Sequence, residues 1–393
     1  PTAKKLLLTS IVVALGYSTA AIAQDTASAI RGKLLDAAGQ PLTNATVVVR
    51  DTRTGATRTL QSNSSGTFYA TNLPVGGPYN VTVNGTKTVT VDSIALGDIY
   101  NLSIEMGESQ IQEIIVLGGA NTFVDVAAGP SATFSTFDME TSVAYDRDIK
   151  DVYSIDPRMN LDGDTQVNCV GKHPRFNSIS LDGISQNDRF GLNSNGYSTA
   201  TGMPFPYEGI AQVSAELAPF DVTYGGFTAC NINAVTKSGS NEWTGTVFLE
   251  RTGDQWRGDS LEVNGQAQDY STKGYTEDVK GFSIGGPLLE DKLFIYGAYE
   301  ESEQPRFLAM GYAGSSNGVE RPWLSKEDHD RIENISNDVY KYNTGGQPND
   351  GAQTDEKYML RLDWNINEQH NATAIYNYYD GVQLRSSDGD SNE

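Results

Sequence analysis

Residues 357–366 read KYMLRLDWNI, and this stretch decides the fold of the C-terminal part of the chain. Successive side chains of an extended strand point to opposite faces. The stretch therefore places an apolar row on one face and a mostly polar row on the other. The apolar row is Tyr358, Leu360, Leu362, Trp364 and Ile366, and the polar row includes Lys357, Arg361, Asp363 and Asn365. This alternation predicts a β-strand with an apolar environment on one side and a polar one on the other.

Four further segments continue the strand pattern. They are WTGTVFLE (243–250), VKGFSIGGP (279–287), KLFIYGAYE (292–300) and NATAIYNYY (371–379). In the first of them Phe248 departs from the alternation, because it falls on the polar face. The connections are alternately long (251–278 and 301–356) and short (288–291 and 367–370), which is typical of a transmembrane β-barrel. A soluble β-sandwich with two insertions is the alternative.

The first half of the chain contains two smaller units. Residues 28–107 hold seven short runs rich in β-branched residues, separated by turn sequences, and this spacing fits a two-sheet β-sandwich. Residues 121–240 mix Gly, Asn and Asp with short apolar runs, which predicts an α+β unit with long polar loops. Its expected elements are strands at 131–137, 177–184, 213–222 and 232–239, a helix at 143–155 and a helical turn at 208–212.

The first 23 residues are predicted to be a signal peptide. Lys4 and Lys5 supply a positive start, an apolar run follows from Leu6 to Leu15, and Ala21-Ile22-Ala23 is a small-x-small cleavage site. A short buried helix is the alternative. Export would bring the mature chain into an oxidising compartment.

The charge of the chain excludes one large class of partners. Among 393 residues, 28 are Lys or Arg and 50 are Asp or Glu, which gives a net charge of −22. A chain this acidic repels phosphate backbones, so we expect no nucleic-acid partner. Past the start, the sequence holds no apolar run long enough for a transmembrane helix.

The sequence offers little for catalysis or metal binding. His173, His329 and His370 are far apart in sequence, and their spacing matches no metal-binding motif. Phosphate-binding GxxxxGK[ST] and GxGxxG motifs are absent. Asp162-Gly163-Asp164 and Asp388-Gly389-Asp390 are interpreted as solvated turns, because neither continues into a calcium-binding loop. We therefore expect no enzyme activity, no catalytic residue and no metal or other cofactor.

The two cysteines, Cys169 and Cys230, both lie in the α+β unit. Two cysteines in an exported chain favour one disulfide, and two free buried thiols are the alternative. Closing so long a loop would stabilise the unit by roughly 4 kcal/mol if the bond acts by restricting the unfolded chain.

Three regions resemble TonB-dependent outer-membrane receptors, and within them the Oar-like group. GKLLDAAGQPLTNATV (32–47) with GTF (66–68) is similar to the carboxypeptidase regulatory-like domain that often precedes the plug of such receptors. RFNSISLDGISQND (175–188) and APFDVTYGGFTACNINAVTKSGSNEWTGTVF (218–248) resemble the plug and its exit into the first barrel strand. GGPLLEDKLFIYGAYE (285–300) resembles an early barrel hairpin.

The resemblance implies a mainly β chain of five parts. They are a signal peptide (1–23), a carboxypeptidase regulatory-like β-sandwich (24–107), a TonB box with its linker (108–120), an α+β plug domain (121–240) and the first strands of an outer-membrane β-barrel (241–393). Barrels of this family have about 22 strands. The sequence holds five such segments, so we expect an N-terminal fragment with an incomplete, truncated barrel.

The resemblance also implies two kinds of functional residue. The TonB box is expected at Ile111, Gln112, Glu113, Ile114, Ile115, Val116 and Leu117. Such a short β-former can add as a strand to a sheet edge of the periplasmic protein TonB; the alternative is the last sandwich strand or its linker. The ligand is expected at plug loops 162–175 and 187–207, with Arg189, Phe190, Tyr197, Phe205 and Tyr207 as candidates. The alternative is that these residues pack the plug against the barrel wall.

As a whole, the resemblance implies an outer-membrane transporter in contact with lipid. It would bind an unknown extracellular solute and admit it to the periplasm when TonB pulls on the plug. An Oar-like surface protein for adhesion or secretion is the second interpretation, and it would not need the TonB box. A soluble secreted β-protein is the third, and it would be released instead of being retained in the outer membrane.

Overall fold

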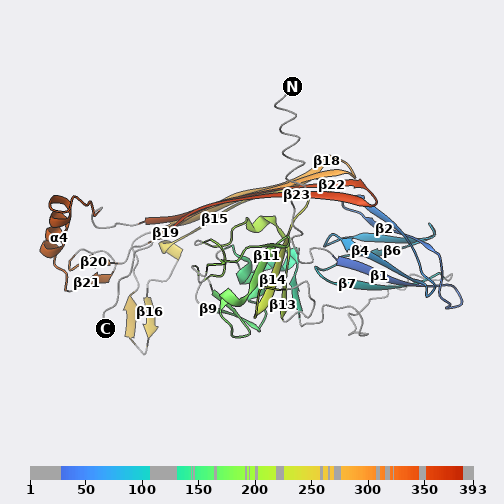
Figure 1. Ribbon diagram of the computed structural model, residues 1–393, viewed down its shortest axis with the longest axis horizontal. Coiled ribbons are helices and arrows are strands. Elements are labelled where there is room, and N and C mark those ends of the chain that lie inside the picture. Colours follow the sequence, from blue (N-terminus) through green and yellow to red (C-terminus); the bar gives the residue numbers. More distant parts are fainter. Residues whose placement is uncertain are drawn as a thin grey trace, which may run out of the picture.

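The computed structural model has a mainly β fold, in which two compact units lie along one side of a long sheet (Figure 1). The predicted signal peptide (1–23) and TonB box (111–117) lie outside the described residues. Among the residues described, no helix is long and apolar enough to cross a membrane. The described ranges are 28–106, 131–142, 144, 147–162, 166–190, 193, 195–199, 202–217, 225–256, 260–263, 266–269, 276–306, 310–314, 319–321, 323–344 and 351–383.

The first unit is the predicted β-sandwich of seven strands. One sheet has the order β4-β1-β7, with β1 at Ser28–Leu35, β4 at Thr67–Leu73 and β7 at Ile99–Glu105. The other has the order β3-β2-β5-β6; its strands are β2 (Thr46–Asp51), β3 (Thr57–Gln61), β5 (Tyr79–Val83) and β6 (Lys87–Val91). Alternate side chains of both sheets meet in one apolar core that includes Ile30, Val47, Phe68 and Val81.

The second unit, which we call the plug, is built on a mixed five-stranded sheet with the order β12-β11-β14-β13-β8. Four of the expected strands are confirmed with shifted ends. They are β8 (Ser131–Phe134), β11 (Ser178–Leu181), β13 (Ile210–Leu217) and β14 (Cys230–Thr236), with β12 (Ile184–Ser185) beside β11. β14 pairs on both sides, and every one of its residues is buried.

The helix predicted at 143–155 is wrong in its bounds. The structure has α2 at Thr136–Thr141 and α3 at Ile149–Tyr153, each starting at a side-chain cap, Ser135 and Asp148. The helical turn expected at 208–212 is η2 at Tyr207–Gly209, and β13 follows at once. The apolar run after Glu208 is therefore strand, because its side chains reach the plug core by pairing with β14. A short hairpin, β9 (Met159–Asp162) with β10 (Gln166–Cys169), and η1 (Pro174–Phe176) complete the plug.

The third unit is the long antiparallel sheet, which we call the wall. Its order is β15-β18-β19-β22-β23, so each strand pairs with the next one of the five along the chain. The strands are β15 (Thr244–Gly253), β18 (Thr276–Leu289), β19 (Leu293–Arg306), β22 (Gly351–Asn367) and β23 (His370–Gln383). All five predicted strands are confirmed, and most are longer than their alternating segments.

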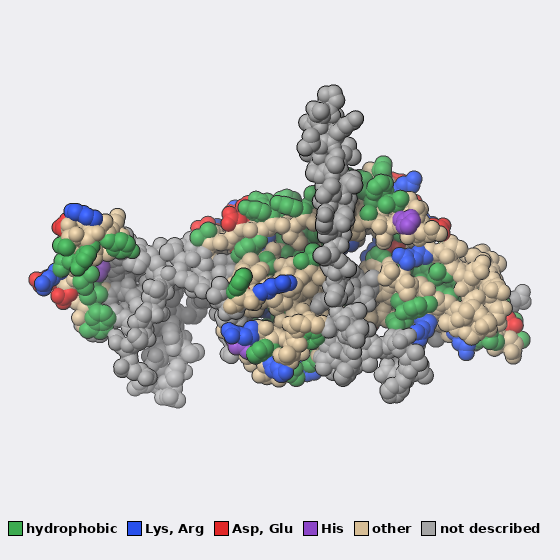
Figure 2. Space-filling model, viewed as in Figure 1, with side chains coloured by type: hydrophobic (Ala, Val, Ile, Leu, Met, Phe, Trp, Pro, Cys, Tyr) green, Lys and Arg blue, Asp and Glu red, His purple; other side chains and the backbone are tan. Residues whose placement is uncertain are grey.

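The two faces of the wall differ as the alternation predicts. On β22, Leu360 and Trp364 are exposed on the outer face, whereas Lys357 and Met359 are buried on the inner face against the plug. Figure 2 shows hydrophobic side chains gathered along the outer side of the wall. Phe282, Tyr299, Tyr358 and Tyr378, neighbours across four strands, form a row of tilted aromatic contacts with ring centroids 5.2–5.7 Å apart.

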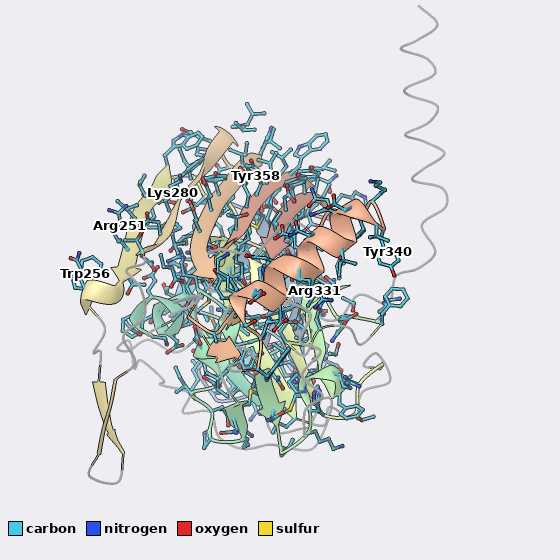
Figure 3. The ribbon with its side chains drawn as sticks, turned by 90° about the vertical axis from the view of Figure 1, so that its left-hand side faces the viewer. Arg251, Trp256, Lys280, Arg331, Tyr340 and Tyr358 are labelled. Carbon is cyan, nitrogen blue, oxygen red and sulfur yellow. A yellow bond between two sulfur atoms is a disulfide. The ribbon has the colours of Figure 1, made fainter. Side chains whose placement is uncertain are left out.

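The two long connections contain structure that the sequence interpretation missed. Residues 251–278 include η3 (Asp254–Trp256) and the hairpin of β16 (Ser260–Val263) and β17 (Gln266–Asp269). Residues 301–356 include β20 (Met310–Tyr312), β21 (Val319–Arg321) and helix α4 (Lys326–Asp338). Figure 3 views this end of the molecule, where α4 lies beyond the wall strands. The side chain of Ser325 caps α4 by accepting a hydrogen bond from the amide of Asp328, 3.1 Å away.

Candidate functional site

The most distinctive site is a buried charge cluster between the plug and the wall, centred on Arg147. Its guanidinium donates hydrogen bonds to three carboxylates. The distances are 2.9 Å to Glu208 of the plug, 2.6 Å to Glu250 of β15 and 3.1 Å to Glu300 of β19. One plug side chain thus binds two wall strands at the same time.

Local structure explains how Arg147 reaches this position. It has a left-handed backbone with φ of 48°, and it directly precedes Asp148, which caps α3. This conformation is uncommon for a residue with a side chain, and it persists where surrounding contacts over-determine it. The three ion pairs of Arg147 are such contacts. Glu208 lies in η2, at the point where the plug chain turns into β13.

Lys357 extends the cluster to a third wall strand. Glu300 and Lys357 are direct cross-strand neighbours on β19 and β22, and Lys357 Nζ donates to Glu300 Oε1 over 2.9 Å. Lys357 Nζ also lies 3.4 Å from Asp355 Oδ1. The backbone amide of Tyr207 donates to Glu300 over 3.2 Å. Glu300 therefore accepts hydrogen bonds from an arginine, a lysine and a peptide N–H. Together they offset the cost of burying its charge completely.

Burial and charge act in opposite directions on Arg147. Burial alone would lower the pKa of its guanidinium. The carboxylates of Glu300, Glu208 and Glu250 together have the larger, opposite effect, so the pKa lies above its ordinary value. Arg147 therefore stays charged. A buried charge of this kind is costly to leave unpaired, so the plug is held most strongly where all three carboxylates are in reach.

Two aromatic rings complete the surroundings of the guanidinium. The Arg147 Cζ atom lies 3.8 Å from the centroid of Phe248 and 5.2 Å from that of Tyr207. Phe248 faces the opposite Gly281 on β18, where a Cβ atom would come within 2.6 Å of the ring. The glycine leaves room for the ring on the inner face. The departure of Phe248 from the strand alternation is thus explained by a cation–π contact with the plug.

A second plug–wall contact is made by Arg361 of β22. Its Nη1 atom donates to the backbone oxygen of Thr236 over 3.0 Å and lies 3.7 Å from Asp182 Oδ1. Its other nitrogens donate to both oxygens of Asp363 on the same strand, over 2.8 and 3.0 Å. Burial raises the pKa of the Asp182 carboxyl, and the charge of Arg361 offsets this only in part.

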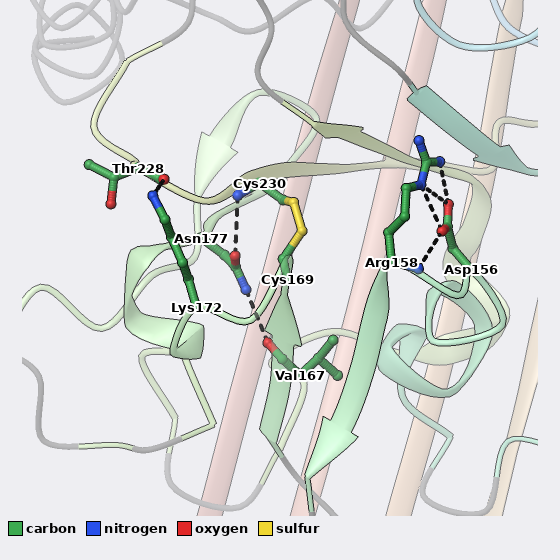
Figure 4. The surroundings of a disulfide bond; sticks show 8 residues. All are labelled: Asp156, Arg158, Val167, Cys169, Lys172, Asn177, Thr228 and Cys230. Atoms are coloured by element: carbon green, nitrogen blue, oxygen red, sulfur yellow. Dashed lines mark hydrogen bonds and ion pairs between the residues drawn. A yellow bond between two sulfur atoms is a disulfide. The ribbon is translucent and has the colours of Figure 1, made fainter.

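The structure joins Cys169 of β10 to Cys230 at the start of β14 in a disulfide, with Cα atoms 6.0 Å apart (Figure 4). Asn177 lies beside the bond. Its side chain accepts a hydrogen bond from the Cys230 amide and donates one to the Val167 carbonyl oxygen. The bond ties the β9–β10 hairpin to the central strand of the plug sheet.

The five ligand candidates do not form one surface. Arg189 is exposed and the Phe190 side chain is 88% exposed, so these two can meet a ligand. Tyr197, Phe205 and Tyr207 are buried members of the plug core. Tyr197 donates a 2.6 Å hydrogen bond to Asp148, and Tyr207 donates one of 2.9 Å to the Met139 carbonyl oxygen. The prediction that these three residues contact a ligand at the surface is wrong. An aromatic residue in a polar loop sequence can still turn into the core.

Two local features bear on the expectation of no enzyme activity and no metal site. His329, Asp330 and Glu333 of α4 bring ligand atoms within 4.8 Å of one another, but Lys326 Nζ already lies 2.6 Å from Asp330. GFSIG (281–285) matches the GxSxG pattern of serine hydrolases, yet Ser283 lies within β18 and pairs on both sides. That pattern needs a sharp strand–helix turn, which β18 does not provide.

The sequence interpretation did not identify the members of the charge cluster. Arg147, Glu208, Glu250, Glu300 and Lys357 are far apart along the chain and match no motif. One signal was present in the strand alternation: Glu250 and Lys357 fall on the face opposite the apolar row, as does the unexpected Phe248. Charged residues that face the inside of a sheet need partners there. Glu250 pairs with Arg147 of the plug, whereas Lys357 pairs with Glu300 of the neighbouring wall strand.

Comparisons with known proteins give a matching domain and a curated relative. Residues 29–107 match the carboxypeptidase regulatory-like domain. The TonB-dependent transporter Oar of Myxococcus xanthus is 24% identical over 400 residues, which cover 94% of this chain and 35% of that protein. The chain thus spans about a third of the length of this curated relative. The relative is a transporter, which is consistent with the expectation that the chain is not an enzyme.

Among solved structures, similar chains include a siderophore receptor and an outer membrane transporter. The siderophore receptor PirA of Acinetobacter baumannii has a TM-score of 0.43 and 16% identity, covering 66% of this chain and 32% of PirA. The outer membrane transporter YddB of Escherichia coli has a TM-score of 0.43 and 11% identity, covering 64% of this chain and 33% of YddB. From the sequence match over most of its length and the matched domain, the chain is similar to TonB-dependent receptors of the Oar type.

Proposed function

We propose that this chain is the N-terminal part of an energy-coupled outer-membrane receptor that takes up a solute. The wall strands β15, β18, β19, β22 and β23 are the first strands of a transmembrane β-barrel, and the plug lies inside it. The proposal is supported by the similarity to a TonB-dependent transporter and by the two-faced wall. Its apolar outer face suits lipid, and its polar inner face suits an occupied lumen.

The observation that carries the proposal is the charged character of the plug–wall contact. Arg147, Lys357 and Glu300 form an interface that is buried but ionic. When an apolar interface separates, its hydrophobic stabilisation is lost without replacement. Charged groups that separate regain hydration instead. An ionic interface therefore holds a plug firmly at rest and still lets an applied force displace it.

We place the point of force on Ile111–Leu117. The segment itself lies outside the described residues, but its neighbours are known: β7 ends at Glu105 and β8 begins at Ser131. A pull on the segment reaches the plug through β8, an edge strand that pairs through four residues with β13. In this proposal the solute meets the plug from the outside, near Arg189 and Phe190.

The test uses the full-length receptor and the soluble periplasmic domain of TonB as the probe. Proline cannot donate to a strand ladder, so Ile115→Pro should abolish the binding of this domain. Ile115→Val is the matched control, since valine keeps the amide donor and the β-branched side chain. Both variants should give a folded, heat-resistant barrel in the outer membrane. Equal binding of the TonB domain to the proline variant and the parent would contradict the coupling mechanism and favour the adhesion interpretation.

A further inference from the structure

The β-sandwich touches the wall at the short β18–β19 turn. The backbone amide of Asn241, which lies between the plug and β15, donates to the Arg53 carbonyl oxygen of the sandwich over 2.8 Å. The Asn241 side chain donates to Asp291 Oδ1 over 2.7 Å and accepts from the Asp291 amide over 2.9 Å. One asparagine thus links the sandwich, the plug exit and the wall turn.

Close packing supports this contact. Gly55, in the turn between β2 and β3, has φ of 67°, and a Cβ atom built on it would lie 1.9 Å from Asp291 Oδ1. Only a residue without a side chain fits there while Asp291 keeps its position. The two turns therefore meet surface to surface.

A second contact binds the sandwich to the plug. The amide of Leu96, in the segment before β7, donates to the side-chain oxygen of Gln212 on β13 over 3.0 Å. Both residues are buried. The sandwich is therefore held at two separate points, one on the wall and one on the plug.

Between these two points lies a cavity of about 730 Å³ that all three units line. The sandwich contributes Pro74 and Val75, and the plug contributes Asp182 and Ser238. The wall contributes Arg361 among other inner-face residues. Ser238 also lines a neighbouring cavity of about 570 Å³ between the sandwich and the short turns of the wall. The space between plug and wall thus ends at the sandwich.

We propose that the β-sandwich is a lid that closes the plug–wall space at the end where the wall has its short turns. The inference rests on the proposed function: outer-membrane barrels have their short turns on the periplasmic side, so the solute must leave at this end. Displacing the plug would then not suffice for release, because the lid must also leave Asp291 and Gln212. Each of the two hydrogen bonds named above contributes about 1 kcal/mol, so the closed state is reversible.

A crosslink tests the closed position in the full-length receptor in outer membranes. A Cβ atom built on Gly55 lies 3.0 Å from the Cβ atom of Asp291. The two Cβ atoms of a disulfide are about 3.8 Å apart, so a small shift of the turn brings the pair to the distance that the bond requires. Gly55→Cys with Asp291→Cys should crosslink on mild oxidation. Gly39→Cys with Asp291→Cys is the control, since a Cβ atom at Gly39 meets nothing within 4 Å. Absence of the first crosslink would overturn the lid.

Labelling tests whether the lid limits access. Ser238→Cys is treated with a charged maleimide in the receptor that lacks the engineered crosslink. Removing both sandwich contacts with Asn241→Pro, which has no backbone N–H to donate to Arg53, and Gln212→Ala should raise its labelling rate about tenfold or more, since each lost hydrogen bond shifts the equilibrium toward the open state. Gln40→Ala, in an exposed turn of the sandwich that lines neither cavity, should leave the rate unchanged. An equal rate in the loosened receptor and the control would contradict the lid.

Neither measurement uses TonB. If the TonB domain fails to bind while the crosslink and the labelling behave as expected, the energy coupling is wrong and the lid stands as a docked domain. If the TonB domain binds but the crosslink does not form, the lid is wrong and the receptor function stands.

Discussion

The guanidinium carbon of Arg147 lies 3.8 Å from the centroid of the Phe248 ring. Arg147 belongs to the plug and Phe248 to the first wall strand, so the contact crosses the interface between them. The same guanidinium binds Glu250, two residues further along β15. An arginine held between an aromatic face and carboxylates is a fixed point, and we infer that it sets the position of the plug against the wall.

Loss of Arg147 should loosen the plug strongly. Arg147→Met would leave the fully buried Glu300 with one cation fewer, and breaking a buried pair costs about 3–5 kcal/mol. The stability of Arg147→Lys should lie between those of Arg147→Met and the parent, because an ammonium group cannot reach three carboxylates as the guanidinium does. The measurement is denaturant unfolding of the full-length receptor, followed by limited proteolysis of the plug. Parent-like stability of the methionine variant would show that the cluster does not hold the plug.

The two wall carboxylates of the cluster should differ in importance. The Glu300 side chain is 1% exposed, whereas that of Glu250 is 48% exposed. Solvent screens the second pair, so Glu250→Gln should cost about 0–1 kcal/mol. Glu300→Gln should cost about 3–5 kcal/mol, because Lys357 and Arg147 both lose their buried partner. Comparing the two unfolding midpoints tests this order, and equal losses would contradict it.

The outer face of β22 should reject a charge. Leu362→Arg is expected to cost about 2–4 kcal/mol if the site lies near the middle of the bilayer. Asn377→Arg is the matched control, because Asn377 lies on β23 opposite Met359, on the inner face. Heat resistance of the folded barrel on a gel measures both. Unchanged resistance of the Leu362 variant would remove the assignment of this face to lipid.

The raised pKa of Asp182 gives a prediction with a sign. Because burial holds its pKa above that of the unfolded chain, the folded state keeps this proton to a higher pH. The wild type therefore loses stability as pH rises between the unfolded value of about 4 and the raised folded value. Asp182→Asn removes this titration, so its stability relative to the wild type should improve as the pH rises above about 4. Unfolding curves at several pH values measure this, and a constant difference would contradict it.

The disulfide should stabilise the plug against unfolding. Replacing Cys169 and Cys230 with serine is expected to cost about 4 kcal/mol, since the two residues close a loop with a sequence separation of 61. Peptide mapping of the exported protein without reductant should recover the linked pair. Full labelling of both thiols by a maleimide after denaturation, without reductant, would show that the bond does not form.

The sequence by itself determined the five strands of the wall. Strict alternation around Leu360 and Leu362 predicted a two-faced strand, and the structure has one there. This works because the period of a strand depends on neighbouring residues alone. Two cysteines in a chain that is expected to be exported likewise predicted one disulfide, and the structure joins them. Helix α4 was missed, although Ser325 and Asp328 form a cap that the sequence displays.

The tertiary structure decided which side chains meet. Arg147 is separated from Glu208 by 61 residues, from Glu250 by 103 and from Glu300 by 153. No local pattern records such a contact, because it depends on how one unit docks on another. The same cause explains Tyr197 and Phe205, which read as loop residues but lie in the plug core. Periodicity shows which face of a strand is polar, whereas burial and charge pairing depend on what the rest of the chain places against that face.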